Sequence, residues 1–340
     1  MVFVECYVKR RNEMIVVRPY SKEFEEQQAA FAQKYWTKKR RFTPEYIYWK
    51  FRGKENEILK SFILAFNEDK VIGQFGLVPT KVTIEETVYD AQWACDLMVD
   101  NEYRGKGVAD ALYEFAHENC LITLGSDPSP AAEKSMIKKG YISLPGPRKF
   151  IFPIKIGEIF KLKGYNSRFL NTIPNPFVLL LKCFSATAFS EIESKDFFQL
   201  KSEKTETKIH CSYDASFIEW RFSSFKNYYQ GIQCYKKNET TFFCGYLSGS
   251  VYYLTDYRAD SVLQLLEIIG FIYQKFSNQK LERIKFLSNA NNTSFILPFF
   301  GSIKFRTPTK IILFTKEHLI REKLSSKIFY YTLFDSDENI

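Results

Sequence analysis

Two glycines and two basic residues stand together at residues 104–109, where the sequence reads RGKGVA. Glycine allows the backbone to turn tightly and to approach a ligand closely. The apolar residues that follow recur with helical spacing over 108–119, so the turn is expected at the start of a helix. Backbone amides at a helix N-terminus bind anions, and Arg104 and Lys106 would add positive charge. The segment therefore predicts a site for a phosphate-bearing ligand. The simpler alternative is a strand-to-helix turn whose basic side chains are solvated.

Other signatures for phosphates and metals are missing from the sequence. There is no GxxxxGK followed by Ser or Thr, which argues against a P-loop triphosphatase. There is no GxGxxG, which argues against a Rossmann dinucleotide site. The seven cysteines include no CxxC pair, and the three histidines lie far apart in the sequence. We therefore expect no metal cofactor.

The stretch before the turn supplies candidates for acid–base chemistry. Strand alternation would place residues 93, 95, 97 and 99 on one face and residues 94, 96 and 98 on the other. Asp96 is then an acid in an otherwise apolar strand, and partial burial would raise its pKa toward that of a useful general base. The alternative is a structural carboxylate that pairs with a basic residue. Cys95 is a further catalytic candidate, although free cysteines most often lie in cores. His117 lies off the apolar stripe of its helix and is expected to be solvated.

Aromatic and acidic residues gather near the C-terminus, where the sequence reads YYTLFDSDENI. Aromatic rings can stack on a base or a sugar, and carboxylates such as Asp335 and Asp337 can bind hydroxyl groups or an amine. Together with Trp93, these two residues are our candidates for binding an acceptor substrate. The alternative is a frayed acidic tail.

Length and composition describe a globular chain with more than one domain. The 340 residues are 45% apolar and 26% charged, which argues against a disordered or fibrous protein. A chain of this length is expected to form two domains. The net charge of +9 suits a polyanionic partner, although excess lysine is also typical of a solvated surface. The odd number of cysteines, the absence of a secretion signal and the lack of a bilayer-spanning apolar stretch favour a cytoplasmic protein.

The elements that position the turn are those of an α/β unit. Residues 60–99 alternate in short apolar runs and are predicted to form a strand meander. Residues 120–125 are expected to form a short buried strand after the first helix. A second helix is expected to begin after Ser129, with proline at its first position, and to end at Gly140.

The second half of the sequence repeats features of the first. Residues 44–52 (PEYIYWKFR) resemble residues 215–223 (ASFIEWRFS), and residues 124–147 resemble residues 287–308 more loosely. Two similarities in the same order indicate a duplication, whereas the alternative is two unrelated α/β domains. A stretch rich in proline and glycine lies between the halves. We therefore predict one domain over 1–155 and a second over 156–340.

The first half resembles the GNAT superfamily of acyl-coenzyme A N-acyltransferases. The family's Q/R-x-x-G-x-G/A signature after the fourth strand is matched by Arg104, Gly107 and Ala109. A second family pattern, NxxAxxxYxKxG followed by Phe or Tyr, is matched downstream at Ala132, Lys138, Gly140 and Tyr141. The sequence departs from that pattern at Ser129, where the family has Asn, and at Met136, where it has Tyr. The resemblance covers about residues 14–150.

The resemblance implies how an acyl-CoA would be held. The coenzyme A pyrophosphate would lie on backbone amides of the turn, with contributions from Arg104, Gly105, Lys106, Gly107, Val108 and Ala109. Ser129 would be a further cofactor contact. The pantetheine would pair like an extra strand with residues 94–99, and the amide of Met98 or Val99 would polarise the thioester carbonyl. Met136 cannot donate a proton, so the family's tyrosine acid has no counterpart at this position.

The second half does not keep this turn. At the equivalent place it reads YLTDYRADSVLQLLEIIG, with Asp256 and Asp260 but no glycine before the helix, and two carboxylates would repel a pyrophosphate. The predicted fold is therefore α/β with tandem GNAT-like lobes, each a twisted mixed sheet flanked by helices, the second degenerate and helping to form the acceptor site.

The tandem layout looks like that of two-lobed bacterial nucleotide-sugar N-acyltransferases. Those enzymes acylate the amino group of a nucleotide-linked aminodeoxysugar for surface polysaccharide. The resemblance is to the type that transfers 3-hydroxybutyryl from coenzyme A to dTDP-3-amino-3,6-dideoxygalactose, so the expected donor is 3-hydroxybutyryl-CoA or acetyl-CoA. A GNAT acetyltransferase for a protein, peptide or polyamine amine is the first alternative. A non-catalytic nucleotide-sugar binding protein is the second. The coenzyme A turn argues against a tandem-GNAT peptidyltransferase that uses aminoacyl-tRNA. Neither nucleic acid nor stable membrane insertion is expected, and the oligomeric state stays open.

Overall fold

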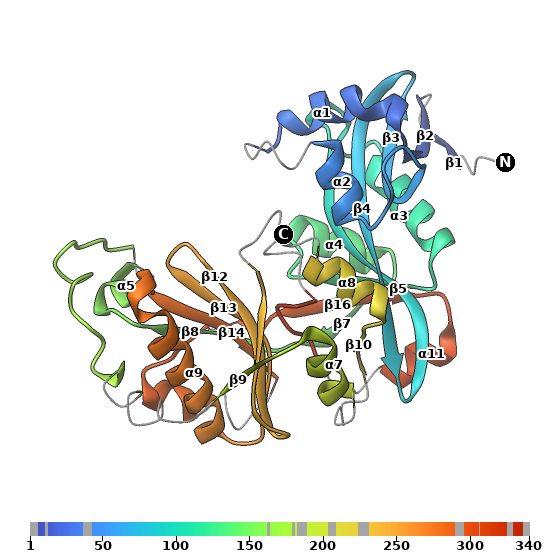
Figure 1. The fold of residues 1–340 in the computed structure, drawn as a ribbon. Coiled ribbons are helices and arrows are strands. Elements are labelled where there is room, and N and C mark those ends of the chain that lie inside the picture. The colour runs from blue at the N-terminus through green and yellow to red at the C-terminus, as the bar shows by residue number, and fades with distance from the viewer. Residues whose placement is uncertain are drawn as a thin grey trace. The chain divides into compact units, whose positions relative to one another are not determined.

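The computed structural model divides the chain into two compact units (Figure 1). Unit 1 comprises residues 1–144 and 311–327, and unit 2 comprises residues 145–310 and 328–340. Within them the structure describes residues 6–10, 13–36, 43–161, 164–178, 181, 189–202, 209–223, 231–289, 296–305, 307–324 and 329–335. The division falls at 144/145 rather than at the predicted 155/156, and a segment of the second half of the sequence returns to unit 1.

Unit 1 is a mixed sheet with helices on both faces. Its strands follow the order β1-β2-β3-β4-β5-β6-β16-β7. Their bounds are β1 Cys6–Arg10, β2 Glu13–Tyr20, β3 Leu59–Asn67, β4 Lys70–Ile84, β5 Thr87–Val99, β6 Ile122–Ser126, β7 Ile142–Pro145 and β16 Lys310–Thr315. Its helices are η1 Lys22–Phe24, α1 Glu25–Gln33, α2 Pro44–Lys50, η3 Asn101–Tyr103, α3 Val108–Asn119, α4 Pro130–Lys138 and α11 His318–Leu324.

The strand meander and both helices predicted for this region are confirmed. Strands β3, β4 and β5 pair in antiparallel fashion, and β5 pairs with β6 in parallel. The apolar stripe of α3 packs on one sheet face together with Met136 of α4 and Ile312 of β16. On α1, which packs against the sheet, Gln28 donates to Gln74 of β4 over 3.2 Å. Helix α4 ends as expected, because Gly140 takes a φ of +89°.

Unit 2 is a second mixed sheet. Its strands follow the order β15-β8-β14-β13-β12-β11-β9. Their bounds are β8 Arg148–Pro153, β9 Ser190–Ile192, β11 Gln233–Asn238, β12 Thr241–Ser248, β13 Val251–Ala259, β14 Arg283–Ser288 and β15 Ile303–Lys304, and a further strand of the unit is β10 Ile209–Ser212. Its helices are α5 Ile156–Lys161, α7 Ser194–Ser202, α8 Ala215–Ser223, α9 Val262–Phe276, η5 Ser277–Gln279 and η6 Leu297–Phe300.

The two units repeat one topology, which supports the predicted duplication. In each unit a helix crosses between two parallel strands: α3 joins β5 to β6, and α9 joins β13 to β14. The WKF and WRF segments also correspond, since they form α2 before β3 and α8 before β11. The strand beside β6 is β16, from the end of the chain, and the strand beside β14 is β8, from the middle. Each sheet is therefore completed by a strand from the other half of the sequence.

No helix in the described ranges combines the length and the apolar character that crossing a bilayer requires.

Candidate functional site

The glycine turn lies at the start of α3, as the sequence predicts. Gly107 is the N-cap residue with a φ of +93°, and Gly105 has a φ of +77° with open space where a side chain would begin. Both conformations favour glycine. Because Gly107 has no side chain, it provides no cap for the first amides of α3. The first amides of α3 therefore have no side-chain cap from Gly107, and amides at a helix N-terminus are suited to an anion.

Strand β5 opens away from β6 just before the turn. Their parallel register runs from the Ala91–Ile122 pair to the Trp93–Leu124 pair, and no later pair follows in the described strands. Residues 94–99 of β5 stay paired with β4 on the other edge. The edge of residues 94–99 on the β6 side therefore has no strand partner in the described ladder beyond Trp93.

The direction of the amides at the end of β5 separates the two candidates for polarising the thioester. The amide of Asp100 donates to the carbonyl of Ile72 over 2.8 Å, so it points toward β4. Successive residues of an antiparallel strand direct their N–H groups to opposite edges. Val99 therefore points its amide to the open edge, and Met98 points toward β4. Arg104 Nε donates to the Val99 carbonyl over 3.4 Å, which agrees with this direction.

A β-bulge interrupts β5 at Asp96. Cys95 pairs with Gly76 and Met98 pairs with Gln74, so two residues of β5 oppose one of β4, and Asp96 takes a φ of +51°. The strict alternation predicted for residues 93–99 is therefore wrong. Leu97 and Val99 pack with Ala94 against the α3 cluster, whereas the sequence had placed them on the face opposite Ala94. The extra residue shifts every later side chain to the other face.

Asp96 forms an ion pair with Lys50, the last residue of α2. Lys50 Nζ lies 2.7 Å from Asp96 Oδ2, the Lys50 side chain is fully buried and that of Asp96 is 14% exposed. This is the alternative that the sequence left open, a carboxylate paired with a basic residue. The sequence analysis did not single out Lys50. Its signal was the repeated Trp–basic–Phe segment, whose second copy places the buried Arg221 against the Phe334 carbonyl.

The other predicted residues of unit 1 have structural partners. Trp93 is buried, and Cys95 is half-buried. Ser129 caps α4 by accepting the Ala132 amide at 3.3 Å. Met136 lies in the core, where the family pattern has its tyrosine.

His117 is not solvated, contrary to the sequence-based expectation. Only 8% of the residue is exposed. Its ring stacks on Phe314 with centroids 3.5 Å apart, and its Nε2 lies 2.8 Å from the Tyr141 hydroxyl. Burial, aided by the charges of Lys316 and Lys139, lowers the pKa of His117 to about 4. The strand that carries Phe314 comes from the end of the chain, so periodicity within α3 gave no sign of it.

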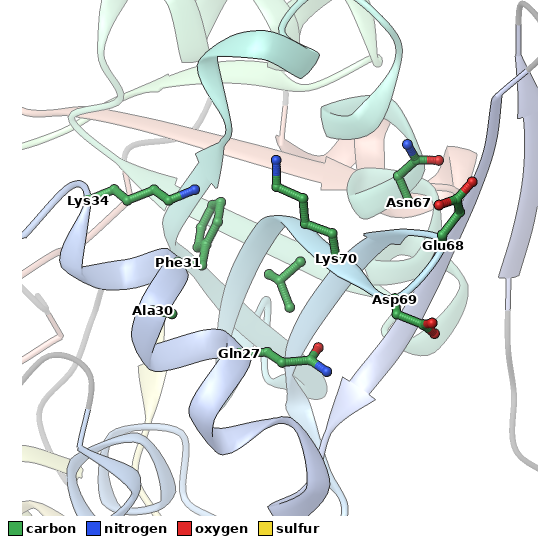
Figure 2. A pocket seen from close by; sticks show the side chains of 9 residues that line it. Gln27, Ala30, Phe31, Lys34, Asn67, Glu68, Asp69 and Lys70 are labelled. Atoms are coloured by element: carbon green, nitrogen blue, oxygen red, sulfur yellow. The ribbon is translucent and has the colours of Figure 1, made fainter.

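An open groove of about 530 Å³ lies between α1 and the β3–β4 turn (Figure 2). Figure 2 shows Lys34 and Lys70 on either side of the Phe31 ring. Both lysines connect the groove to the segment that precedes the turn, since Lys34 Nζ lies 3.3 Å from Asp100 and Lys70 Nζ lies 3.7 Å from Glu102. Glu68 and Asp69 also line the groove, so its charges balance.

The comparison with family models matches residues 16–121 to the acetyltransferase (GNAT) domain. Residues 16–121 are thus similar to a GNAT domain. The match covers the meander, the glycine turn and α3. No curated protein matches the sequence.

Solved structures share the fold at low sequence identity. A GCN5-related N-acetyltransferase from Anabaena variabilis is 14% identical with a TM-score of 0.55, and one from Kribbella flavida is 10% identical with a TM-score of 0.57. Both matches cover 88% of this chain and 72% of the other. Saccharomyces cerevisiae N-myristoyltransferase with bound myristoyl-CoA is 13% identical with a TM-score of 0.55, over 93% of this chain and 85% of that one. The predicted fold class is confirmed: two mixed sheets flanked by helices, like the tandem GNAT lobes of N-myristoyltransferase.

In unit 2, side chains cap the start of the crossover helix α9, whereas the start of α3 has no side-chain cap. Ser261 caps α9 by accepting the Gln264 amide at 3.2 Å, and Gln264 Oε1 accepts the amides of Ser261 and Asp260. The sequence suggested that Asp256 would repel a pyrophosphate at this turn. Asp256 is buried and forms an ion pair with Lys201. The amides of Asp260, Ser261 and Gln264 therefore already have side-chain acceptors at this helix start.

Asp335 is the last residue of the acidic tail that the structure describes. Asp335 is buried, and its carboxylate accepts hydrogen bonds from the Tyr213 hydroxyl at 2.5 Å and from the Thr332 amide at 2.8 Å. These bonds favour a structural role over contact with a substrate. Asp337 lies outside the described residues.

Proposed function

We propose that the chain is an acyl-CoA-dependent N-acyltransferase whose acceptor is the amino group of a nucleotide-linked aminodeoxysugar. The observation that carries the donor half of this proposal is the uncapped start of α3 beside the open edge of β5. These features suit a pyrophosphate and an extended pantetheine respectively. The N-myristoyltransferase neighbour holds an acyl-CoA, which supports the same donor class.

The acceptor class rests on the sequence resemblance to two-lobed bacterial nucleotide-sugar N-acyltransferases, with dTDP-amino sugars as the specific expectation. Such enzymes supply a modified sugar for surface polysaccharide. Fold likeness to the solved structures does not distinguish among amine acceptors, so the acceptor is the part of the proposal that the assay below must decide.

In the proposed reaction the neutral amine attacks the thioester carbonyl carbon. The Val99 amide is placed to stabilise the negative charge that forms on the carbonyl oxygen. The carbon–sulfur bond then breaks, and the thiolate takes a proton from the acylated nitrogen through water, because Met136 cannot supply one. The sequence assigns Asp96 as general base. Its ion pair with Lys50 favours a positioning role, in which Asp96 holds the bulge that sets the direction of the Val99 amide.

The test is a screen for thiol release with acetyl-CoA and 3-hydroxybutyryl-CoA against dTDP-amino sugars, peptides and polyamines. We expect release with a dTDP-amino sugar. Gly107→Glu should abolish both release and acyl-CoA binding, because a carboxylate would enter the anion site. Gly249→Glu is the matched control, since Gly249 has a positive φ as Gly107 does but lies in a hairpin of unit 2. Release with peptides or polyamines alone would replace the acceptor, and no release with any amine would favour a binding protein.

A further inference from the structure

A pocket of about 350 Å³ in unit 2 lies on the sheet face turned away from α9. Phe150, Phe152, Ile284 and Phe286 point into the core that α9 covers. The alternating residues of the same two strands, β8 and β14, therefore point to the other face. Lys149, Ile151, Arg283, Lys285 and Leu287 of that face line the pocket, which Phe150 and Phe286 also border, and its volume is within the range of small-molecule sites.

Three cationic side chains line this pocket, and none of its described lining residues is acidic. Lys285 pairs with Ile151 across the strands and Lys149 pairs with Leu287, so the two lysines are diagonal neighbours on one face. Arg283 lies two residues before Lys285 on the same face. Its Nη1 donates to Glu158 over 3.0 Å, while its buried Nε has no acceptor in the described part of the chain. The pocket differs in this from the groove of unit 1, where lysines and carboxylates balance.

Aromatic rings lie beside these charges. Tyr253 pairs with Lys285 in the parallel register of β13 and β14, and Lys285 Nζ lies 5.3 Å from the centre of its ring. The Tyr253 ring also stacks on Tyr246, with centroids 5.2 Å apart. Phe305, which is 38% exposed, adds a second ring to the lining. Two aromatic rings beside two neighbouring lysines suit a ligand that carries both an aromatic base and phosphates.

We propose that this pocket binds a nucleoside diphosphate, with the phosphates at Lys149 and Lys285 and the base against Tyr253 and Phe305. That this nucleotide is part of the acceptor rests on the proposed function. Coenzyme A also contains a nucleotide, so the experiment must distinguish the two sources of the same chemistry.

The test measures dTDP and coenzyme A binding by calorimetry with the full chain and its variants. Lys285→Glu should weaken dTDP binding by roughly tenfold to a hundredfold, the value of one or two charge-assisted hydrogen bonds, and should leave coenzyme A binding unchanged. Gly107→Glu should give the reverse pattern. Lys60→Glu, at an exposed position in β3, is the control for an equal change in charge. Phe305→Leu should weaken dTDP but not inorganic pyrophosphate, because only the base contact is removed.

Each outcome has one meaning. Retained dTDP affinity in a folded Lys285→Glu variant overturns the pocket assignment. Loss of coenzyme A affinity in that variant assigns the pocket to the donor's own nucleotide, which also overturns the proposal. Retained coenzyme A affinity in Gly107→Glu contradicts the proposed function but does not contradict the nucleotide pocket.

Discussion

At the residue scale, Lys50 and Asp96 form a buried pair whose charges can be removed singly or together. Lys50→Met or Asp96→Asn should each lower the free energy of unfolding by about 3 kcal/mol, because the remaining group stays buried without its partner. The double variant should recover most of that loss, since no charge is left unpaired. Urea unfolding of the four proteins provides the measurement, and a double variant as unstable as the sum of the singles would contradict it.

The same four proteins separate the two roles of Asp96 in turnover. A general base is lost in both variants without the carboxylate, so kcat should fall by ~10²–10⁴ in the single Asp96→Asn variant and stay low in the double. A positioning role predicts instead an unchanged pH profile in both variants, with part of kcat regained in the double variant because no unpaired charge is left buried beside the bulge. We expect the second pattern. Persistent loss of kcat in a stable double variant would restore Asp96 as the base.

His117 makes the stability of unit 1 dependent on pH. Its pKa of about 4 in the folded chain lies below the ordinary value near 6.5, so the unfolded chain binds the proton more tightly. This contribution to stability is present above pH 6.5 and is lost as pH falls from 6.5 toward 4. His117→Gln should remove that part of the pH dependence, whereas His318→Gln, at an exposed position on α11, should keep it. Equal slopes in all three unfolding curves would contradict the assignment.

At the scale of elements, α4 carries the buried Met136 at the position where the family pattern has tyrosine. Met136 is 3% exposed and packs near Gly125 and Ile312. Met136→Tyr should therefore lower the free energy of unfolding by about 1–3 kcal/mol through overpacking, without raising kcat. Ile137→Tyr, at a position 47% exposed on the same helix, is the control and should change stability little. A large rise in kcat for Met136→Tyr would show that a tyrosine acid can be restored.

The sequence predicted the helices and strands better than the contacts between them. The meander, the turn and α3 and α4 were all found from local patterns, because glycine, proline and apolar spacing act within a few residues. The bulge at Asp96 was missed, since the pairing of Gly76 with Cys95 and of Gln74 with Met98 is set between strands. The burial of His117 was missed for the same reason, because its stacking partner is distant in the sequence. The Lys50 contact likewise joins a helix to a strand 46 residues away.

At the scale of the molecule, the two units differ at one equivalent point, the start of the crossover helix. Gly107 leaves the first amides of α3 without a side-chain cap, whereas at α9 Ser261 accepts the Gln264 amide and Gln264 accepts the Ser261 amide. We therefore expect one coenzyme A per chain. Calorimetric titration of the full chain measures this stoichiometry, and Ser261→Gly should not create a second site, because Gln264 Oε1 still accepts the amides of residues 260 and 261. Two equivalents bound would contradict the argument from capping.

The exchange of strands between the halves has a consequence for synthesis on the ribosome. Strand β16, residues Lys310–Thr315, lies between β6 and β7 in the sheet of unit 1. The amino-terminal part of the chain thus emerges first but lacks an interior strand of its own sheet until almost the whole polypeptide has been translated. Until then β6 and β7 have unpaired edges, which are prone to improper pairing. Nascent chains arrested before residue 310 should therefore be protease-sensitive in their first 144 residues, and chains released after residue 327 should be resistant.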